Sequence, residues 1–392
     1  MTSIRTQVGI VGAGPAGLLL SHLLALSGVE SVVLEDRARS YVETRVRAGV
    51  LEQGSVDLLC ESGVGERMLA EGAVHDGVIL QFCGERHRID FAALTGKRIT
   101  VYGQQEVLKD LIAARLSAGG AIYFEVDDVC PEGTTTDAPV ISFSHGGVRH
   151  ELHCDFVAGC DGFHGVCRAA VPAVVRREFT REYPFAWLGV LAEVAPSTDE
   201  LIYAYHERGF ALHSMRSPEL SRLYVQVHPT EQLAAWPDER IWDELRHRLD
   251  SAGFTLHEGP LIERSITTMR SFVCEPMQHG RLFLAGDAAH VVPPTGAKGM
   301  NLALADVAVL ARALVRWFDR GERDALDAYS DTCLRRVWRV QDFSMLLTEL
   351  LHRLPDADPF AAGVQRARQR YLAESAAMRT TIAENYVGLP IG

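Results

Sequence analysis

A glycine-rich turn near the N-terminus constrains the fold more than any other feature of the sequence. It follows a short apolar run at residues 7–11, precedes a helical pattern, and has the spacing G-x-G-x-x-G at Gly12, Gly14 and Gly17. Small residues there let the backbone approach a pyrophosphate, while the N-terminus of the following helix favours its negative charge. A second apolar run ends at Glu35, about 20 residues after the turn, where such units place an acid on a ribose hydroxyl. The segment therefore predicts a strand–turn–helix–strand unit that binds a dinucleotide.

Composition limits the remaining function classes. The 392 residues are 47% hydrophobic and 23% charged, which suits a globular protein of two or three packed units. A formal net charge of -12 argues against a nucleic-acid partner, because such a partner requires a basic face. The eight cysteines include no C-x-x-C pair, so neither a disulfide framework nor a metal site is expected. Glycines interrupt the N-terminal apolar stretch, so we expect no signal peptide, no membrane association and a cytoplasmic location.

The pattern of the chain changes twice after the N-terminal unit. Short alternating segments broken by turn residues occupy residues 183–227 and predict an antiparallel sheet. After residue 281, apolar positions recur at three- or four-residue steps over 301–318, 325–351 and 363–385 and predict a helical C-terminal third.

Two further motifs, the first of which has two parts, distinguish between the classes of dinucleotide-binding protein. Residues 281–290 read RLFLAGDAAH, residues 293–301 read PPTGAKGMN before a helix, and residues 159–165 read GCDGFHG. Further matches are RAGVLEQ at 47–53, YGQ at 102–104, PFAWLG at 184–189 and ENYVGLP at 384–390. In this order the motifs resemble those of the class A FAD-dependent aromatic hydroxylases, in particular the branch that acts on 4-hydroxybenzoate. The resemblance runs from end to end of the chain.

This resemblance implies an α/β fold with an α+β substrate part. We expect an FAD-binding, Rossmann-like parallel sheet of the glutathione-reductase type over residues 1–177, and an antiparallel substrate-binding sheet over 178–276. A flavin-contacting G-D segment and a helical interface region would occupy 277–392. Asp287 would hold the ribityl chain, and the helix beginning near Gly299 would direct its positive end at the flavin. The FAD-binding residues implied are Gly12, Gly14, Gly17, Glu35, Arg45, Arg47, Gln104, Asp161, Arg222, Asp287, Gly296, Lys298, Gly299, Met300 and Asn301.

The segment around residue 216 predicts an anion-binding hairpin from its spacing alone. Ser214 and Arg216 share one face of a strand, and Arg222 and Tyr224 share one face of the next. With residues 217–221 as the loop, the register pairs 214 with 224 and 216 with 222, so two arginines face each other. Like charges in that position are destabilising unless an anion lies beside them, and a carboxylate gripped by Arg216 would serve. A solvated hairpin with outward charges is the alternative. The resemblance implies that Ser214, Arg216 and Tyr224 hold a substrate carboxylate and that Arg222 lies near the flavin.

Electrophilic hydroxylation of a phenol requires the phenolate, although a phenol titrates at about 10 in water. The site must therefore remove a proton from the substrate. The resemblance implies a relay of Tyr203, Tyr386 and His75, with the Pro294 carbonyl orienting the substrate hydroxyl and Thr295 beside the flavin. Taken singly, each of the three relay side chains is more typical of a packing or surface position.

The nicotinamide coenzyme contacts follow from the same resemblance. Asp36 stands where NADPH-preferring relatives carry a basic residue, and beside Glu35 it would repel a 2′-phosphate. Arg37 and Arg39 could offset this repulsion, so we expect NADH to be accepted well and leave NADPH open. The implied contacts are Asp36, Arg37, Tyr41, Arg45, Arg47, His164 and Arg270. Family precedent also implies a homodimer, with a possible face near residues 335–353.

The expected reaction converts 4-hydroxybenzoate into 3,4-dihydroxybenzoate with NADH or NADPH and O2, through a flavin C4a-hydroperoxide. One alternative is hydroxylation of a related ring, such as 3,4-dihydroxybenzoate or an aminobenzoate. Another is a flavin-dependent reductase that inserts no oxygen, which would need neither the anion site nor the relay. A non-catalytic binding protein is the least favoured interpretation, because such a chain would be expected to lose parts of the relay.

Overall fold

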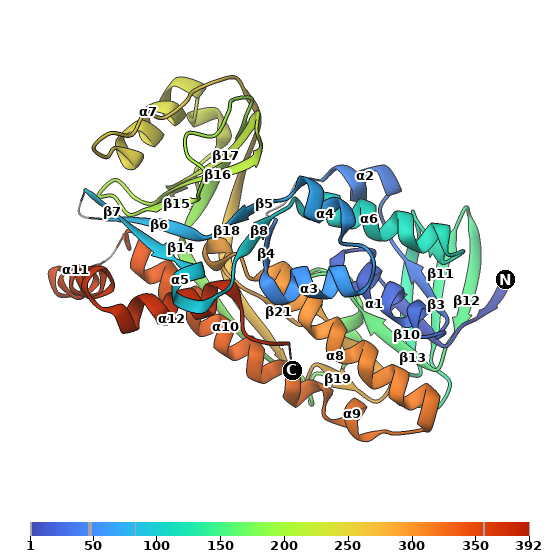
Figure 1. Cartoon of the computed structure of the whole chain (residues 1–392). Coiled ribbons are helices and arrows are strands. Elements are labelled where there is room, and N and C mark those ends of the chain that lie inside the picture. Colours follow the sequence, from blue (N-terminus) through green and yellow to red (C-terminus); the bar gives the residue numbers. More distant parts are fainter. Residues whose placement is uncertain (1, 46–48, 83, 356, 392) are drawn as a thin grey trace.

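The computed structural model describes residues 2–45, 49–82, 84–355 and 357–391 (Figure 1). A parallel sheet lies at the right of Figure 1, an antiparallel sheet lies at the upper left, and the C-terminal helices run below them. The expected α/β architecture, with these three parts, is confirmed.

The parallel sheet is built around the glycine-rich turn. Wholly buried β2 (Val8–Val11) and β3 (Ser31–Leu34) pair in parallel and are joined through α1 (Pro15–Leu26). The six strands have the order β19-β20-β13-β2-β3-β9. The other four are β9 (Ala121–Tyr123), β13 (Phe156–Gly159), β19 (Gln278–His279) and β20 (Leu282–Leu284). Because β2, β13 and β20 are parallel neighbours, the turns after them meet at one edge of the sheet.

Smaller elements complete the N-terminal half. One sheet has the order β1-β12-β11-β10 and another the order β4-β8-β5. Their strands are β1 (Thr2–Arg5), β4 (Val50–Glu52), β5 (Ala73–His75), β8 (Ile99–Val101), β10 (Asp127–Glu132), β11 (Val140–His145) and β12 (Val148–His153). The helices are α2 (Arg39–Thr44), α3 (Gln53–Glu61), α4 (Glu66–Glu71), α5 (Phe91–Thr95), α6 (Gln104–Ser117) and the 3-10 turn η1 (Cys167–Ala170).

The antiparallel region is an eight-stranded sheet of order β21-β18-β14-β17-β16-β15-β6-β7. Its strands are β6 (Gly77–Phe82), β7 (Glu85–Asp90), β14 (Arg177–Ala192), β15 (Ile202–Ala204), β16 (Ala211–Ser217), β17 (Leu220–Val227), β18 (Leu261–Glu275) and β21 (His290–Val291). The range 1–177, which we expect to bind FAD, thus also supplies β6 and β7 to the sheet centred on 178–276. β15 pairs with β6 in parallel, and this pairing attaches β6 and β7 to the rest of the sheet.

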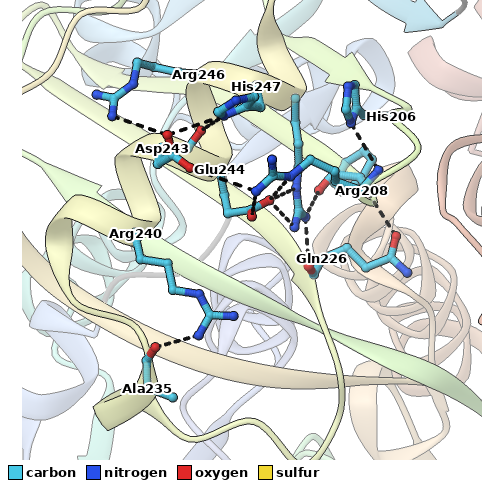
Figure 2. Close-up of polar contacts among 11 residues, drawn as sticks. His206, Arg208, Gln226, Ala235, Arg240, Asp243, Glu244, Arg246 and His247 are labelled. Carbon is cyan, nitrogen blue, oxygen red and sulfur yellow. Dashed lines mark hydrogen bonds and ion pairs between the residues drawn. The ribbon is translucent and has the colours of Figure 1, made fainter.

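The two faces of this sheet are covered differently. Leu188, Leu223 and Val225 pack against α7 (Asp238–Leu249), which follows the turn η2 (Leu233–Ala235). Residues on the opposite face, including Trp187 and Leu212, pack against the C-terminal helices. Figure 2 shows polar contacts at α7, where Arg208 and Glu244 lie near Gln226. The second face is the one that carries the predicted substrate residues.

The hairpin of β16 and β17 corrects the predicted register. Ser214 pairs with Arg222 and Leu212 with Tyr224, so the register is displaced by two residues from the prediction. Ser217 pairs with Leu220, which leaves a two-residue turn instead of the expected five-residue loop. The register shifts between positions 215 and 217, so Arg216 lies at a bulge and not directly opposite Arg222.

Helices dominate the C-terminal third, as predicted. They are α8 (Gly299–Arg320), α9 (Asp324–Asp327), α10 (Tyr329–Leu351), α11 (Pro359–Glu374) and α12 (Ala376–Val387). The pattern at 363–385, expected as one helix, is divided because the Ser375 side chain accepts from Met378 N and starts a new helix. Turns η3 (Gly286–Ala288) and η4 (Pro294–Gly296) precede α8. Among the described residues, no helix combines the length and apolarity needed to cross a bilayer.

Candidate active site

The three glycines of the N-terminal turn occupy three different environments. Gly12 has φ +103°, and a Cβ there would lie 2.3 Å from the Cys160 carbonyl oxygen. A Cβ on Gly17 would lie 1.9 Å from the Gly12 carbonyl oxygen, so α1 can approach β2 only without a side chain. Gly14, at the N-cap of α1, faces open space within 4 Å. The turn therefore offers a free helix N-terminus at which a pyrophosphate fits.

Glu35 lies directly after β3 and closes one side of this turn. Its carboxylate accepts hydrogen bonds from Ala13 N at 2.6 Å and from Arg37 N at 3.0 Å. Burial, together with neighbouring Asp36, raises the pKa of Glu35 to about 7 despite these two bonds. A carboxylate held this way presents an acceptor beside the glycine turn, as a ribose hydroxyl requires.

Asp161 lies where β13 ends, beside the same turn. Its Oδ2 accepts from Cys167 N at 2.8 Å, whereas its buried Oδ1 has no hydrogen-bond partner among the described residues. A Cβ on Gly165 would lie 2.0 Å from the Asp161 carboxyl carbon, so that glycine leaves room for the side chain. Burial raises the pKa of Asp161.

Two residues that were not predicted as site residues, Asp306 and His290, hold the G-D turn after β20 in place. Asp306 Oδ2, on α8, accepts from Gly286 N at 3.0 Å and lies 2.6 Å from His290 Nε2. Both side chains are 1% exposed. Although burial alone would lower it, Asp306 raises the pKa of His290. An acid within the apolar pattern of 301–318 was the signal that could have identified Asp306, because carboxylates are rarely buried without a partner.

The segment before α8 is tied to the distant strand β4. Lys298 Nζ donates to Glu52 Oε1 at 2.6 Å and to the Tyr386 carbonyl at 2.8 Å, and the lysine is 1% exposed. Asn301 Oδ1 accepts from Glu52 N at 2.9 Å. Burial lowers the pKa of Lys298. Glu52 was not predicted as a site residue, since its partner is 246 positions away.

The remaining predicted FAD positions surround this segment. Gly299 begins α8 and faces open space within 4 Å, so the helix N-terminus is accessible to a ligand. Gly296 is buried in η4, Met300 is half-buried, and Gln104 is the first residue of α6. Asp287 is half-buried in η3 beside the His290–Asp306 pair. With the open glycine turn and the unpartnered Asp161 oxygen, these residues fit an FAD molecule.

Arg216 is the residue best placed to receive an anion on the substrate face. Its Nη1 donates to the Met215 carbonyl at 2.9 Å, while its Nε is buried without a hydrogen-bond partner among the described residues. Burial lowers the pKa of Arg216, with Arg222 adding to the effect and Tyr224 opposing it. Ser214 Oγ donates to the Arg222 carbonyl at 2.8 Å, so it must rotate to donate to a ligand.

Arg222 has a carboxylate counter-ion, and Arg216 has none among the described residues. Its Nη1 lies 3.0 Å from Glu263 Oε1, and its guanidinium carbon lies 5.4 Å from the centre of the Tyr224 ring. Gly189 makes room for both side chains, since a Cβ there would lie 2.8 Å from the Tyr224 ring and 3.3 Å from Arg222 Nη2. The Nε of each arginine is buried without a hydrogen-bond partner among the described residues. The charge of Arg222 is nevertheless offset by Glu263, so Arg216 is the better anion site.

Two tyrosines meet on the same face. Tyr203 and Tyr386 are each 2% exposed, and their hydroxyl oxygens lie 2.7 Å apart. Burial raises the pKa of Tyr203 to about 12 and also raises the pKa of Tyr386 well above its ordinary value. The structure thus brings these two predicted relay residues together although they are 183 positions apart.

His75 is the last residue of β5, and its neighbour Asp76 is connected to the tyrosine pair through Phe91. It is buried, and its Nδ1 has no hydrogen-bond partner among the described residues. Phe91, whose ring stacks on Tyr386 at 5.0 Å, donates its backbone N–H to the carbonyl of neighbouring Asp76 at 2.7 Å. Burial lowers the pKa of His75. Proton passage between His75 and the tyrosines would need a bridging molecule such as water.

η4 carries the other two predicted substrate contacts. The Pro294 carbonyl accepts from Ala297 N at 2.9 Å and keeps one lone pair for a further donor. Thr295 is fully buried, and its hydroxyl donates to Thr348 Oγ1 at 3.0 Å, because Thr348 Oγ1 donates its own proton to the Ser344 carbonyl.

The predicted coenzyme residues form two groups. On α2, the centre of the Tyr41 ring lies 5.6 Å from the guanidinium carbon of Arg37 and 5.5 Å from that of Arg45, and Arg37 lies 3.5 Å from Asp36. His164 and Arg270 both contact Phe163, at 5.0 and 4.8 Å between group centres. Arg47, predicted to contact both FAD and the coenzyme, lies outside the described residues.

Comparisons with known proteins agree with this geometry. Residues 5–344 match the family described as the FAD binding domain. Over 392 residues, the chain is 50% identical to p-hydroxybenzoate hydroxylase of Acinetobacter baylyi, covering all of this chain and 97% of that protein. It is 28% identical to rifampicin monooxygenase of Streptomyces venezuelae, covering 76% of this chain and 62% of that longer protein. The structure also resembles p-nitrophenol 4-monooxygenase of Pseudomonas putida, with a TM-score of 0.83 and 19% identity over 98% of this chain and 97% of that one. That last likeness concerns the fold.

Proposed function

The chain belongs to the FAD binding domain family and to its FAD-dependent aromatic hydroxylases, and on that premise we propose that it hydroxylates 4-hydroxybenzoate beside its hydroxyl group. The product is 3,4-dihydroxybenzoate. One observation carries the proposal: the unpartnered, buried Arg216 Nε lies on the sheet face that also carries the Tyr203–Tyr386 pair. An anion site and a proton path on one face suit a substrate with a carboxylate at one end and a phenol at the other.

Arg216 binds the substrate carboxylate in this proposal. A bidentate contact would satisfy its free Nε and offset the repulsion from Arg222. Tyr224 and a rotated Ser214 hydroxyl complete the hydrogen bonds. Glu263 already balances Arg222, so the site is built for one carboxylate.

Tyr203 and Tyr386 remove the phenolic proton from the opposite end. A Tyr203 hydroxyl that donates to the substrate oxygen stabilises the phenolate, and Tyr386 accepts the proton in turn at 2.7 Å. His75 is the outer group of this path, and the Pro294 carbonyl orients the substrate hydroxyl. Low exposure of both tyrosines keeps bulk water away from the reacting ring.

FAD, when bound, takes electrons from the nicotinamide coenzyme and activates O2 for transfer to the ring. Gly14 and Glu35 would hold its pyrophosphate and ribose, Asp287 its ribityl chain, and the N-terminus of α8 its pyrimidine end. Buried Lys298, paired with Glu52, lies directly before that end of the helix. We propose NADH as an accepted coenzyme at the Arg37–Tyr41–Arg45 group, and a soluble homodimer as the assembly.

The test is oxidation of NADH and of NADPH by the purified holoenzyme in air, with and without 4-hydroxybenzoate. We expect the substrate to stimulate oxidation severalfold and to yield 3,4-dihydroxybenzoate, identified by mass and retention time. Stimulation without a hydroxylated product would favour a reductase. Stimulation only by an aminobenzoate or by 3,4-dihydroxybenzoate would assign a related ring.

A further inference from the structure

The last turn of α10 packs against the substrate face of the eight-stranded sheet. Thr348 in this turn and His352 directly after it have no exposed surface, although both are polar. A buried polar group is costly unless it is hydrogen-bonded, so the partners of these side chains indicate what the turn holds in place.

His352 makes two hydrogen bonds whose directions follow from its partners. Its Nδ1 lies 2.9 Å from the Thr348 carbonyl oxygen, which can only accept, so Nδ1 carries the proton. Its Nε2 therefore accepts from Trp187 Nε1, 2.7 Å away. Because burial lowers the pKa of His352 to about 3, the imidazole stays neutral and keeps both bonds at physiological pH.

Aromatic rings fix the plane of this imidazole. His352 stacks on Phe185 at 4.5 Å and on Phe210 at 4.3 Å between ring centres. Phe210 also stacks on Trp187 at 5.1 Å, with an interplanar angle of 11°. The imidazole thus has little freedom to turn away from the Trp187 indole.

The same turn contacts the opposite wall of the site. Thr348 Oγ1 donates its one proton to the Ser344 carbonyl at 2.7 Å and accepts from Thr295 Oγ1 at 3.0 Å, on the flavin side in the proposed function. One residue beyond His352, Arg353 N donates to Gln226 Oε1 at 3.0 Å, and Gln226 pairs with Trp187 in the sheet. A single helical turn therefore links the flavin side and the sheet side of the pocket.

Trp187 transmits this constraint to the substrate face. Its ring centre lies 4.9 Å from that of Tyr224, one of the proposed carboxylate-binding residues. We propose that His352 is a positioning residue: by accepting the Trp187 hydrogen bond, it holds the indole against Tyr224 and sets the angle at which the aromatic substrate meets the flavin side. This inference rests on the proposed function for the identity of the substrate.

The test separates the effect of the His352 hydrogen bond from the effect of its ring stacking. His352→Phe keeps the stacking but leaves Trp187 Nε1 buried without an acceptor, and we expect it to weaken 4-hydroxybenzoate binding to the holoenzyme about tenfold. The fraction of NADH oxidised without product should also rise, while the dissociation constant of FAD stays unchanged. The double variant Trp187→Phe with His352→Phe removes both polar partners and should recover most of the lost affinity.

A matched control is His213→Phe. His213 is also fully buried and accepts a hydrogen bond, from Ser197 N at 3.0 Å, but it lies on the α7 face of the sheet. The His213→Phe variant should have a lower unfolding temperature than the wild type but no higher rate of uncoupled NADH oxidation. Equal uncoupling in His213→Phe and His352→Phe, or a double variant no better than His352→Phe, would overturn the inference.

One measurement reads the hydrogen bond in the wild-type enzyme and needs no substrate. In ¹⁵N-labelled wild-type holoenzyme, the Trp187 Nε1–H resonance, assigned by its loss in Trp187→Phe, should exchange slowly and couple to His352 Nε2. A fast-exchanging, uncoupled resonance would refute the inference even if the enzyme hydroxylates 4-hydroxybenzoate. Conversely, a coupled resonance in an enzyme that ignores this substrate would remove the proposed function and keep His352 as the group that holds Trp187.

Discussion

At the scale of the residue, substrate recognition depends on an imbalance between two arginines. Arg222 has the carboxylate of Glu263 at 3.0 Å, whereas Arg216 has no acidic partner among the described residues, and the Nε of each arginine is buried there without a hydrogen-bond partner. Burial of an unpaired guanidinium is tolerated only where a ligand completes it.

Replacing Arg216 therefore gives the most direct prediction about affinity. Arg216→Lys keeps the charge but loses the planar fork, so we expect the dissociation constant of 4-hydroxybenzoate to rise about 10- to 100-fold, or roughly 1.4–2.7 kcal/mol. Fluorescence titration of the holoenzyme measures it. Arg208→Lys, an exposed arginine paired with Glu244, is the control and should change nothing. An unchanged constant for Arg216→Lys would place the carboxylate elsewhere.

Glu35 makes FAD binding depend on pH. Its pKa is raised to about 7 by burial and by Asp36, yet a ribose hydroxyl donates to the ionised form. FAD binding should therefore release a proton, and the affinity of the apoprotein should rise about tenfold between about pH 6 and about pH 8. Titration at both pH values tests this, and Glu35→Gln should flatten the dependence. A flat profile in the wild type would contradict the assigned role.

Asp36 controls the choice of coenzyme in this proposal. Asp36→Arg should raise the ratio of kcat/KM for NADPH over NADH about tenfold, because a 2′-phosphate would meet a cation instead of an anion. Asp319→Arg makes the same change of net charge at the far end of α8 and should leave the ratio unchanged. A ratio unaffected by Asp36→Arg would show that discrimination lies in other residues.

At the scale of the element, α8 does more than present its N-terminus to the flavin. Asp306, two turns into the helix, binds the G-D turn and His290 together. The helix and the turn that carries Asp287 therefore move as one unit.

Breaking this connection should loosen FAD binding. Asp306→Asn leaves His290 without its counter-ion, which should cost about 3 kcal/mol of stability and weaken FAD binding about tenfold. Because the pKa of His290 is raised, the ion pair stabilises fully below about pH 6.5 and is lost as pH rises through the folded-state pKa. Thermal unfolding should therefore show a larger difference from wild type at about pH 6 than at about pH 9. An equal difference at both would mean that the pair is not ionic.

At the scale of the whole molecule, the region around residues 335–353 presents aromatic surface. Trp338 is 41% exposed and Phe179 is 38% exposed, and their rings meet edge to face at 5.3 Å where α10 approaches β14. Such a pair suits contact with a second copy.

We expect a homodimer in sedimentation equilibrium, and Trp338→Glu should shift the population towards monomer by at least tenfold in dissociation constant. Leu26→Glu changes an apolar residue that is more exposed, at 60%, at the end of α1 and should leave the dimer intact. A monomeric wild type would remove the assembly from the proposal.

Local patterns in the sequence predicted the parts of the fold that are determined locally. The glycine turn, its flanking strands and the C-terminal helices follow from spacing and periodicity. Contacts between distant segments could not be predicted from spacing, such as Lys298 with Glu52 and β15 with β6. The register of β16 and β17 was wrong because a bulge and a two-residue turn replace a regular loop, and both depend on packing rather than on local preference. The pairing of Tyr203 with Tyr386 was expected only from the resemblance.

The two longest strands have a consequence for how this scaffold can be divided. β14 and β18 pair from Arg177↔Glu275 to Ala192↔Leu261, and β18 also joins Val273 to His290 beneath the G-D turn. A cut at the ends of these strands, before Arg177 and after Glu275, would keep their ladder but would remove β6, β7 and β21 from the same sheet. Separately expressed halves should therefore fail to reassemble, and a substrate sheet transplanted from a relative would arrive without its alignment to the flavin. New substrates are better sought by exchanging single side chains on the substrate face than by recombining whole modules.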